Sequence, residues 1–158
     1  MPSWLAAVEA EIQAKANAPS ASLRALDRAE TALDRVEAGE VPAWMDYYDT
    51  TRLNGFKGFA YLRLRRPADA QAALRAALGS LGASATKQRT IFQADLATSF
   101  VQQGEIDEGC RLAGQAAATL AQAGYATSGG RLREFRELVT PWQDRPAVKE
   151  FALPASMS

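Results

Sequence analysis

The sequence predicts an all-α fold made of antiparallel helix hairpins. Apolar residues recur at steps of three and four, short Gly- and Pro-containing breaks separate the helical stretches, and no alternating strand pattern competes. One helix-pair pattern also recurs, which is typical of helical repeat arrays that act by contact. Its two full copies have identical offsets, and its third copy is partial: Gly58, Tyr61, Ala70, Leu74 and Ala77; Ala97, Phe100, Gly109, Ala113 and Ala116; Ser22, Leu26 and Ala29.

The first two helices are expected over residues 2–17 and 20–38, separated by Pro19 and Ser20, with Gly39 ending the second. The second helix has one apolar face, formed by Leu23, Leu26, Ala29, Leu33 and Val36. The first helix carries Trp4, Leu5, Val8 and Ile12. A terminal repeat helix has no neighbour to cover it, so we expect this apolar face to pack on an upstream domain or to form a homodimer.

The third helix is expected over residues 43–65, and the fourth over 68–81. Pro67 restricts the residue before it and suits the first turn of the next helix, so it marks the boundary between the two.

The remaining helices are expected over residues 87–103, 105–123, 130–139 and 146–151, with a frayed tail over 152–158. Gly104 and Gly124 end two of them. The chain thus reads as one domain, 1–158, of four hairpins over about 2–39, 43–81, 85–123 and 130–152.

Composition excludes several classes of protein. With 158 residues, 47% hydrophobic and 23% charged, the chain is too apolar to be disordered. Lys plus Arg and Asp plus Glu both number 18, so no overall field attracts nucleic acid or an anionic membrane. The start MPSWLAAVEAEIQ is unlike a secretory signal, and no stretch reaches the roughly 18 apolar residues of a membrane span. We expect a cytoplasmic protein without membrane association.

Site chemistry argues against an enzyme. The chain has no histidine, and Cys110 is its single cysteine, so histidine-dependent metal sites and nucleophilic triads are excluded. The carboxylate pairs Asp46/Asp49 and Asp107/Glu108 are explained by helix caps and solvated faces. Ser128-Gly129-Gly130 reads as a helix start. We expect no catalytic residues, no metal and no cofactor.

The two full copies resemble the tetratricopeptide repeat (TPR), which has a small residue and an aromatic in its first helix and Ala, an apolar residue and Ala in its second. The resemblance implies a right-handed α-solenoid. The match is in pattern rather than in strict period, because Ser22, Ala70 and Gly109 are 48 and 39 residues apart and the standard repeat has about 34.

A narrower resemblance covers most of the chain. The segments PAW, GFAYLRLRRPADAQAALRAAL, ADLATSFVQQGEIDEGCRLAGQAA, SGGRLREFRELVTPW and PAVKEF are similar to the C-terminal repeat region of actinobacterial helix-turn-helix transcriptional regulators. In that family the region follows a DNA-binding domain and senses or passes on a signal. Only about 40 residues precede Trp44 here, and they read as another helix pair, so we expect no direct DNA binding by this chain.

The TPR resemblance also implies a ligand-facing surface along the first helix of each pair. Transferred to this sequence, the expected ligand- or partner-binding residues are Tyr48, Arg52, Phe59, Arg63, Lys87, Ile91, Thr98 and Gln102. Cations beside aromatic rings suit a carboxylate of a protein or peptide, or a small anionic ligand. The same residues also fit a purely structural interpretation, in which arginine stems cover apolar surface and Tyr48 and Phe59 belong to the core.

Two functions fit these observations. The first is a non-catalytic TPR-like binding module, the signal- or partner-sensing part of a bacterial transcriptional regulator. The alternative is a stand-alone TPR-like scaffold or accessory protein that docks on a partner enzyme or peptide.

Overall fold

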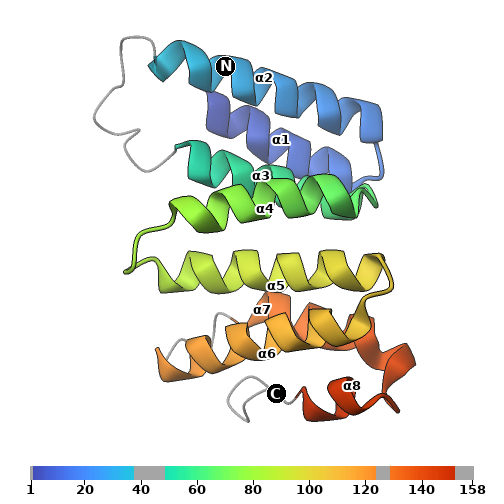
Figure 1. Cartoon of the computed structure of the whole chain (residues 1–158). Coiled ribbons are helices and arrows are strands. Elements are labelled where there is room, and N and C mark those ends of the chain that lie inside the picture. Colours follow the sequence, from blue (N-terminus) through green and yellow to red (C-terminus); the bar gives the residue numbers. More distant parts are fainter. Residues whose placement is uncertain (1, 38–48, 124–128, 152–158) are drawn as a thin grey trace. The chain divides into compact units, whose positions relative to one another are not determined.

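A computed structural model of the chain describes residues 2–37, 49–123 and 129–151 (Figure 1). In these ranges the secondary structure consists of α-helices and one short 3-10 helix, without any strand, which confirms the all-α class. The contacts divide the chain into two compact units, Met1–Ser80 and Leu81–Ser158, here called unit 1 and unit 2. The expected single domain over 1–158 stays a prediction. Each described helix is too short or too polar to traverse a bilayer.

The described part of unit 1 forms two hairpins: α1 (Ser3–Lys15) and α2 (Pro19–Glu37), then α3 (Thr50–Arg63) and α4 (Pro67–Ser80). Helix α1 packs against both α2 and α3, and α3 packs against α4 (Figure 1). Pro67 begins α4, as the sequence predicts.

The predicted start of the third helix is wrong. Helix α3 begins at Thr50 because Asp49 has an extended backbone and caps the helix, accepting a 2.9 Å hydrogen bond from the backbone N–H of Arg52. The remainder of the predicted helix, residues 43–48, lies outside the described residues, and so does Asp46.

Unit 2 contains the hairpin α5 (Thr86–Gln102) and α6 (Ile106–Gln122), followed by α7 (Gly130–Val139) and α8 (Pro146–Glu150). Helix α7 packs against α5 and α6, and α8 packs against α6. The sequence prediction missed a short 3-10 helix, η3 (Thr140–Trp142), which continues directly from α7. Its three residues are too few for a periodic signal.

The three hairpins α1–α2, α3–α4 and α5–α6 share one turn. Each has three residues between its helices, and the middle one has a left-handed backbone: Asn17 (φ 55°), Arg65 (φ 57°) and Gly104 (φ 85°). The next residue donates its N–H to the carbonyl five positions back: Ala18 to Gln13, Arg66 to Tyr61 and Glu105 to Phe100, each at 2.9 Å. This hydrogen bond is the signature of a Schellman turn at a helix C-terminus.

Counting from the left-handed residue confirms the repeat register. Five residues later stands a small residue in every hairpin, namely Ser22, Ala70 and Gly109, and seven residues earlier stands another, namely Ala10, Gly58 and Ala97. These positions meet at the helix crossings. The hydroxyl of Ser22 donates to the carbonyl of Ala10 at 2.9 Å, and a Cβ added to Gly109 would lie 3.0 Å from the carbonyl oxygen of Ala97. The first hairpin therefore follows the pattern in both of its helices, except that Gln13 stands where the other two hairpins have the aromatics Tyr61 and Phe100.

Each unit has its own apolar core. In unit 2, the rings of Phe135 and Phe151 pack edge to face at 5.2 Å among residues of α5, α6 and α7. In unit 1, the expected core face of α2 is confirmed at Leu26, Ala29 and Leu33, which are buried. Trp4 is half-buried and packs against this core.

Candidate ligand-binding face

Helix α3 carries three of the predicted ligand-binding residues in unit 1. Arg52, Phe59 and Arg63 are seven and four residues apart, so they follow one face of the helix. Arg52 is half-buried and Arg63 is exposed. Tyr48, the fourth predicted residue of this helix pair, lies outside the described residues.

Phe59 does not present an open ring. Its side chain is buried, with 5% of its surface exposed, which fits the structural interpretation of this residue, in which Phe59 belongs to the core. Two cations lie over the ring: the Arg63 guanidinium carbon is 5.1 Å from the ring centroid and the Lys15 Nζ is 5.3 Å from it. Both distances are within the range of cation–π attraction. Phe59 thus holds two positive groups that come from different helices.

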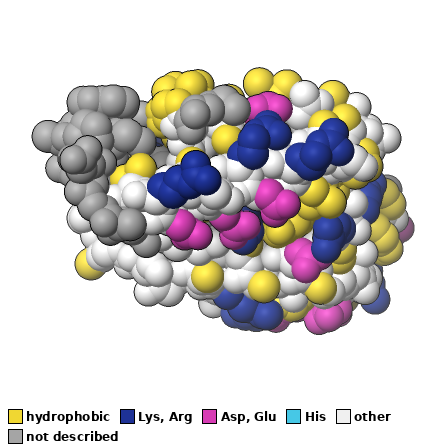
Figure 2. Space-filling model, turned by 90° about the horizontal axis from the view of Figure 1, so that it is seen from above, with side chains coloured by type: hydrophobic (Ala, Val, Ile, Leu, Met, Phe, Trp, Pro, Cys, Tyr) yellow, Lys and Arg dark blue, Asp and Glu magenta, His cyan; other side chains and the backbone are white. Residues whose placement is uncertain are grey.

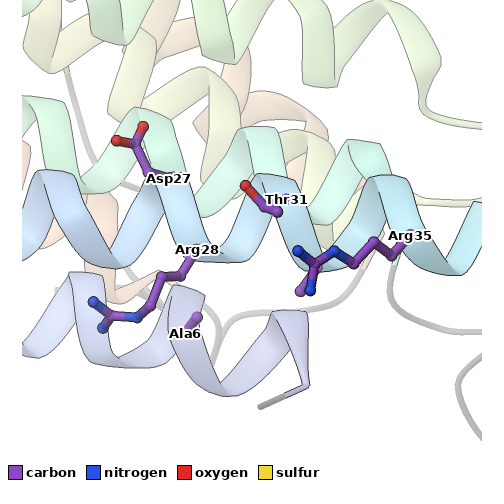
Figure 3. Close-up of a pocket in the computed structure, with 6 residues that line it drawn as sticks. Ala6, Asp27, Arg28, Thr31 and Arg35 are labelled. Carbon is purple, nitrogen blue, oxygen red and sulfur yellow. The ribbon is translucent and has the colours of Figure 1, made fainter.

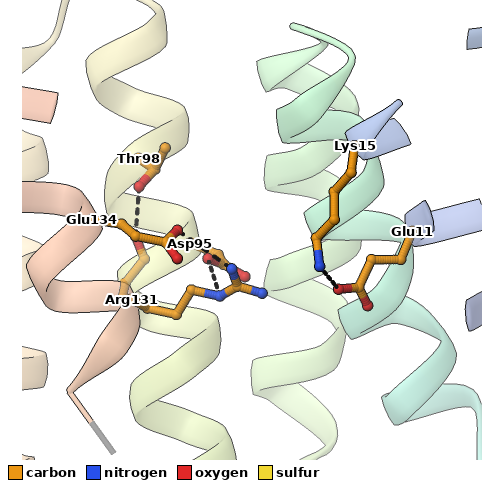
Figure 4. A network of polar contacts seen from close by, with 7 residues as sticks. Glu11, Lys15, Asp95, Thr98, Arg131 and Glu134 are labelled. Carbon is orange, nitrogen blue, oxygen red and sulfur yellow. Dashed lines mark hydrogen bonds and ion pairs between the residues drawn. The ribbon is translucent and has the colours of Figure 1, made fainter. Parts of the chain in front are cut away.

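Lys15 is a residue that the sequence analysis missed. It lies in the last turn of α1, and its ammonium group pairs with Glu11 at 2.7 Å (Figure 4). The repeat register would have found it, because Lys15, Arg63 and Gln102 each stand two residues before the left-handed turn residue. Only the second helix of the first hairpin was matched to the repeat pattern, so no repeat positions were assigned to the residues of α1.

In unit 2, helix α5 carries the other four predicted residues. Lys87, Ile91, Thr98 and Gln102 are four, seven and four residues apart and follow one face of the helix. Lys87 is exposed and the other three are half-buried. The hydroxyl of Thr98 donates to the backbone carbonyl of Ala94 at 3.1 Å, so its hydrogen is already engaged within the helix.

A buried carboxylate lies on the same face of α5. Asp95 stands four residues after Ile91 and three before Thr98, and 7% of its side-chain surface is exposed. The Nε of Arg131 in α7 lies 3.4 Å from it, and another nitrogen of the same guanidinium lies 3.5 Å from Glu134 (Figure 4). Burying a carboxylate is costly unless a cation compensates it, so Arg131 is a structural necessity for this face.

Asp95 was absent from the predicted site, although the sequence carries a signal for it. It is the one acidic residue in the run TIFQADLATSFV. Its helical spacing from Ile91 and Thr98 predicts that it lies on the same face of the helix as these two residues. Its partner Arg131 lies 36 positions later in the chain, and no local pattern connects the two.

The predicted groove combined residues of α3 with residues of α5. The residues of α3 belong to unit 1 and those of α5 belong to unit 2, so their combination into one groove stays a prediction. Within unit 1, Arg52 and Arg63 are eleven residues apart, which corresponds to about 16 Å along a helix. They cannot hold the same carboxylate. Lys15 and Arg63 share one ring and form the compact basic part of the face.

Cys110 offers no reactive nucleophile. It is buried in the core of unit 2, and burial raises the pKa of its thiol, with nearby Asp107 raising it further and Arg145 opposing this. A raised pKa lowers the thiolate fraction at neutral pH, and the thiolate is the reactive form. Among the described residues, no group of three or more acidic, cysteine or histidine side chains is placed to hold a metal ion.

Comparison with known proteins leaves the chain without an assigned family. No protein-family model matches it, and neither a curated protein nor a solved structure gives a match. Function is therefore inferred from the face itself.

Proposed function

We propose that this chain is a non-catalytic TPR-like binding module with a right-handed α-solenoid arrangement of its hairpins. Support comes from the three hairpins, which share one turn geometry and one pair of small residues at the helix crossing. In a repeat array, equivalent positions of successive hairpins present side chains to one continuous surface. Within unit 1, the proposed ligand surface has Lys15 and Arg63 at one equivalent position, with the buried ring of Phe59 beneath both cations.

The observation that carries the proposal is the pair of cations on Phe59. Lys15 and Arg63 both lie within 5.3 Å of one ring centroid, and against the one carboxylate of Glu11, which pairs with Lys15, they leave a net positive charge at this end of the face. A buried ring beneath them favours this arrangement without contributing a counter-charge. The chemistry fits a carboxylate, supplied by a protein, a peptide or a small anionic ligand, with Arg63 able to bind both of its oxygens.

The resemblance to actinobacterial regulators supplies the biological setting. On that basis the module senses a signal or a partner for a bacterial transcriptional regulator in the cytoplasm. It does not bind DNA by itself, because DNA affinity comes from several phosphate contacts by clustered Lys and Arg, whereas the chain carries equal numbers of acidic and basic residues.

The test uses reversal of charge on the face. Immobilised protein captures partners from native lysate, mass spectrometry identifies proteins and small molecules, and the captured ligand is titrated against variants. Arg52→Glu/Arg63→Glu should weaken binding at least tenfold, since each charge-assisted hydrogen bond contributes about 1.5–3 kcal/mol. The matched control, Arg65→Glu/Arg133→Glu, makes the same change in net charge at two exposed residues outside the face.

Undiminished binding by the Arg52→Glu/Arg63→Glu variant would overturn the proposed face. Equal weakening by both double variants would mean that overall charge, rather than the site, attracts the ligand. Tight, salt-sensitive binding of the wild type to duplex DNA would contradict the proposal that this chain does not bind DNA by itself.

A further inference from the structure

A shallow depression lies between α1 and α2 of unit 1. Its volume is about 330 Å³, near the lower end of the range for small-molecule sites. It is lined by Ala6, Asp27, Arg28, Thr31, Ala32 and Arg35 (Figure 3). None of these residues belongs to the ligand-binding face around Phe59, so the depression is a separate feature of the unit.

The depression has hydrogen-bond donors along one side and methyl groups next to them. Arg28, Thr31 and Arg35 are three and four residues apart on α2, which places all three on one face of that helix (Figure 3). Ala6 of α1 and Ala32 of α2 are small, so the depression is not filled by their side chains. Two guanidinium groups and a hydroxyl form a donor set suited to an oxyanion.

The two arginines differ in their present partners. Arg28 pairs with Glu9 of α1 at 2.7 Å, which fixes its guanidinium beside the depression. A guanidinium has five N–H donors, so this ion pair leaves donors for a second acceptor. Arg35 is exposed and makes no ion pair or side-chain hydrogen bond within the described ranges. Two acids, Asp27 in the lining and Glu9 on Arg28, balance the two arginines in number, but Asp27 stands eight residues before Arg35, which is about 12 Å along the helix, so the positive charge lies at the Arg35 end of the depression.

The surrounding surface favours a small ligand over a polyanion. Figure 2 views the molecule from the side of α2, and basic and acidic side chains are interspersed over it. A nucleic acid or another polyanion requires an extended basic patch. The positive charge here is confined to the end of the depression at Arg35.

We propose that the depression between α1 and α2 binds a small molecule through a phosphate or carboxylate group. Arg35 and Arg28 each contribute a charged hydrogen bond, Thr31 contributes its hydroxyl, and the half-buried Ala32 contacts the apolar part of the ligand.

The test is a titration of the full ¹⁵N-labelled chain at low ionic strength, followed by two-dimensional NMR, with inorganic phosphate, diphosphate and succinate as probes. Saturable shifts should appear at the amides of Ala6, Thr31 and Ala32. A response to the phosphates alone, to succinate alone or to both supports the site and identifies the preferred oxyanion. Arg35→Gln should weaken binding about tenfold, as expected for loss of a hydrogen bond to a charged group, and Arg28→Gln similarly.

Arg24→Gln is the matched control. Arg24 is exposed on the same helix, one turn before Arg28, but does not line the depression. Its loss should change the dissociation constant by less than about twofold, as for an ordinary surface substitution. No saturable response to any probe at millimolar concentration, or equal weakening by Arg24→Gln and Arg35→Gln, would overturn the site. Arg52→Glu/Arg63→Glu should leave this binding intact, so the two proposals fail independently.

Discussion

At the residue scale, two glycines have no room for a side chain as their neighbours now stand. A Cβ on Gly109 would lie 2.7 Å from the Cγ2 of Val101 and 3.0 Å from the backbone oxygen of Ala97, and a Cβ on Gly58 would collide with the side chain of Leu74. Both glycines belong to the repeat pattern of the sequence, each in one of its two full copies. Glycine is needed there because the neighbouring atoms are too close for any side chain, not because of its backbone freedom.

We expect Gly109→Ala to destabilise the protein by about 1–3 kcal/mol, because overpacking outweighs the gain in helix propensity. Gly114 is the control in the same helix, since a Cβ there meets nothing within 4 Å. Gly114→Ala should stabilise by about 0.5–1 kcal/mol. Thermal unfolding followed by circular dichroism measures both. An unchanged melting temperature for Gly109→Ala would contradict the packing at this crossing.

Cys110 should be slow to react with Ellman's reagent in the native protein at neutral pH and should react fully after unfolding, because its thiol is buried and has a raised pKa. The same shift affects stability. Above the unfolded-state pKa of about 8.5, the unfolded chain loses the proton first, so stability falls as pH rises through this range. Cys110→Ala should lack this alkaline loss in denaturant titrations. Rapid native labelling would be inconsistent with burial.

At the scale of elements, the three turns differ in the residue that adopts the left-handed conformation. Gly104 accepts it without cost, whereas Arg65 has a Cβ that opposes it. Gly104→Ala should therefore destabilise by about 1 kcal/mol, and Arg65→Gly should stabilise by up to about 1 kcal/mol. Urea denaturation measures both changes. The same sign of change for the two substitutions would argue against a shared turn geometry.

Helices α1 and α2 are connected by two buried serine hydroxyls. Ser3 donates to the carbonyl of Ala29 at 2.6 Å, and Ser22 donates to that of Ala10 at 2.9 Å. Ser3→Ala and Ser22→Ala should each cost about 0.5–1.5 kcal/mol of unfolding free energy. Ser80 is the control, because its exposed hydroxyl bonds only to its own helix, and Ser80→Ala should have little effect. Equal effects of all three would show that the interhelical bonds contribute nothing specific.

At the scale of the whole molecule, α1 has two apolar faces. Its alanines Ala6, Ala7, Ala10 and Ala14 are buried, whereas Leu5 and Ile12 are 39% and 58% exposed. This exposure is consistent with the homodimer contact expected from the sequence, and that contact stays a prediction. Trp4 is less suitable for testing it, because it also packs against the core of unit 1.

In analytical ultracentrifugation, we expect the wild type to sediment as a dimer and the Leu5→Glu/Ile12→Glu variant to sediment mainly as a monomer. Burying two carboxylates in an apolar contact is unfavourable. The control is Gln115→Glu/Gln143→Glu, which adds the same charge at two exposed residues outside α1. A wild type that sediments as a monomer at all concentrations would remove the homodimer.

What the sequence determined by itself is mostly local. Periodic alanines and leucines, Pro67 and Gly104 place the helices and turns of all three hairpins, because these signals act between residues a few positions apart. Arg52, Arg63 and Lys87 were named as ligand-binding residues through the resemblance to the tetratricopeptide repeat, and their role stays a prediction. The predicted start of α3 was wrong because Asp49 can either cap a helix that begins at Thr50 or stand inside a longer helix. Helical propensity alone does not decide between these two possibilities.

The tertiary structure alone decided which side chains meet. Lys15 reaches Phe59 across 44 positions of sequence, and Arg131 reaches Asp95 across 36. Such pairs depend on how α1 packs on α3 and α7 on α5, and no short-range pattern specifies these contacts. Phe59 shows where prediction from sequence ends. Its helical spacing fitted both a ligand contact and a core position. Only the packing around it shows that the ring is buried, with 5% of its surface exposed, beneath two cations.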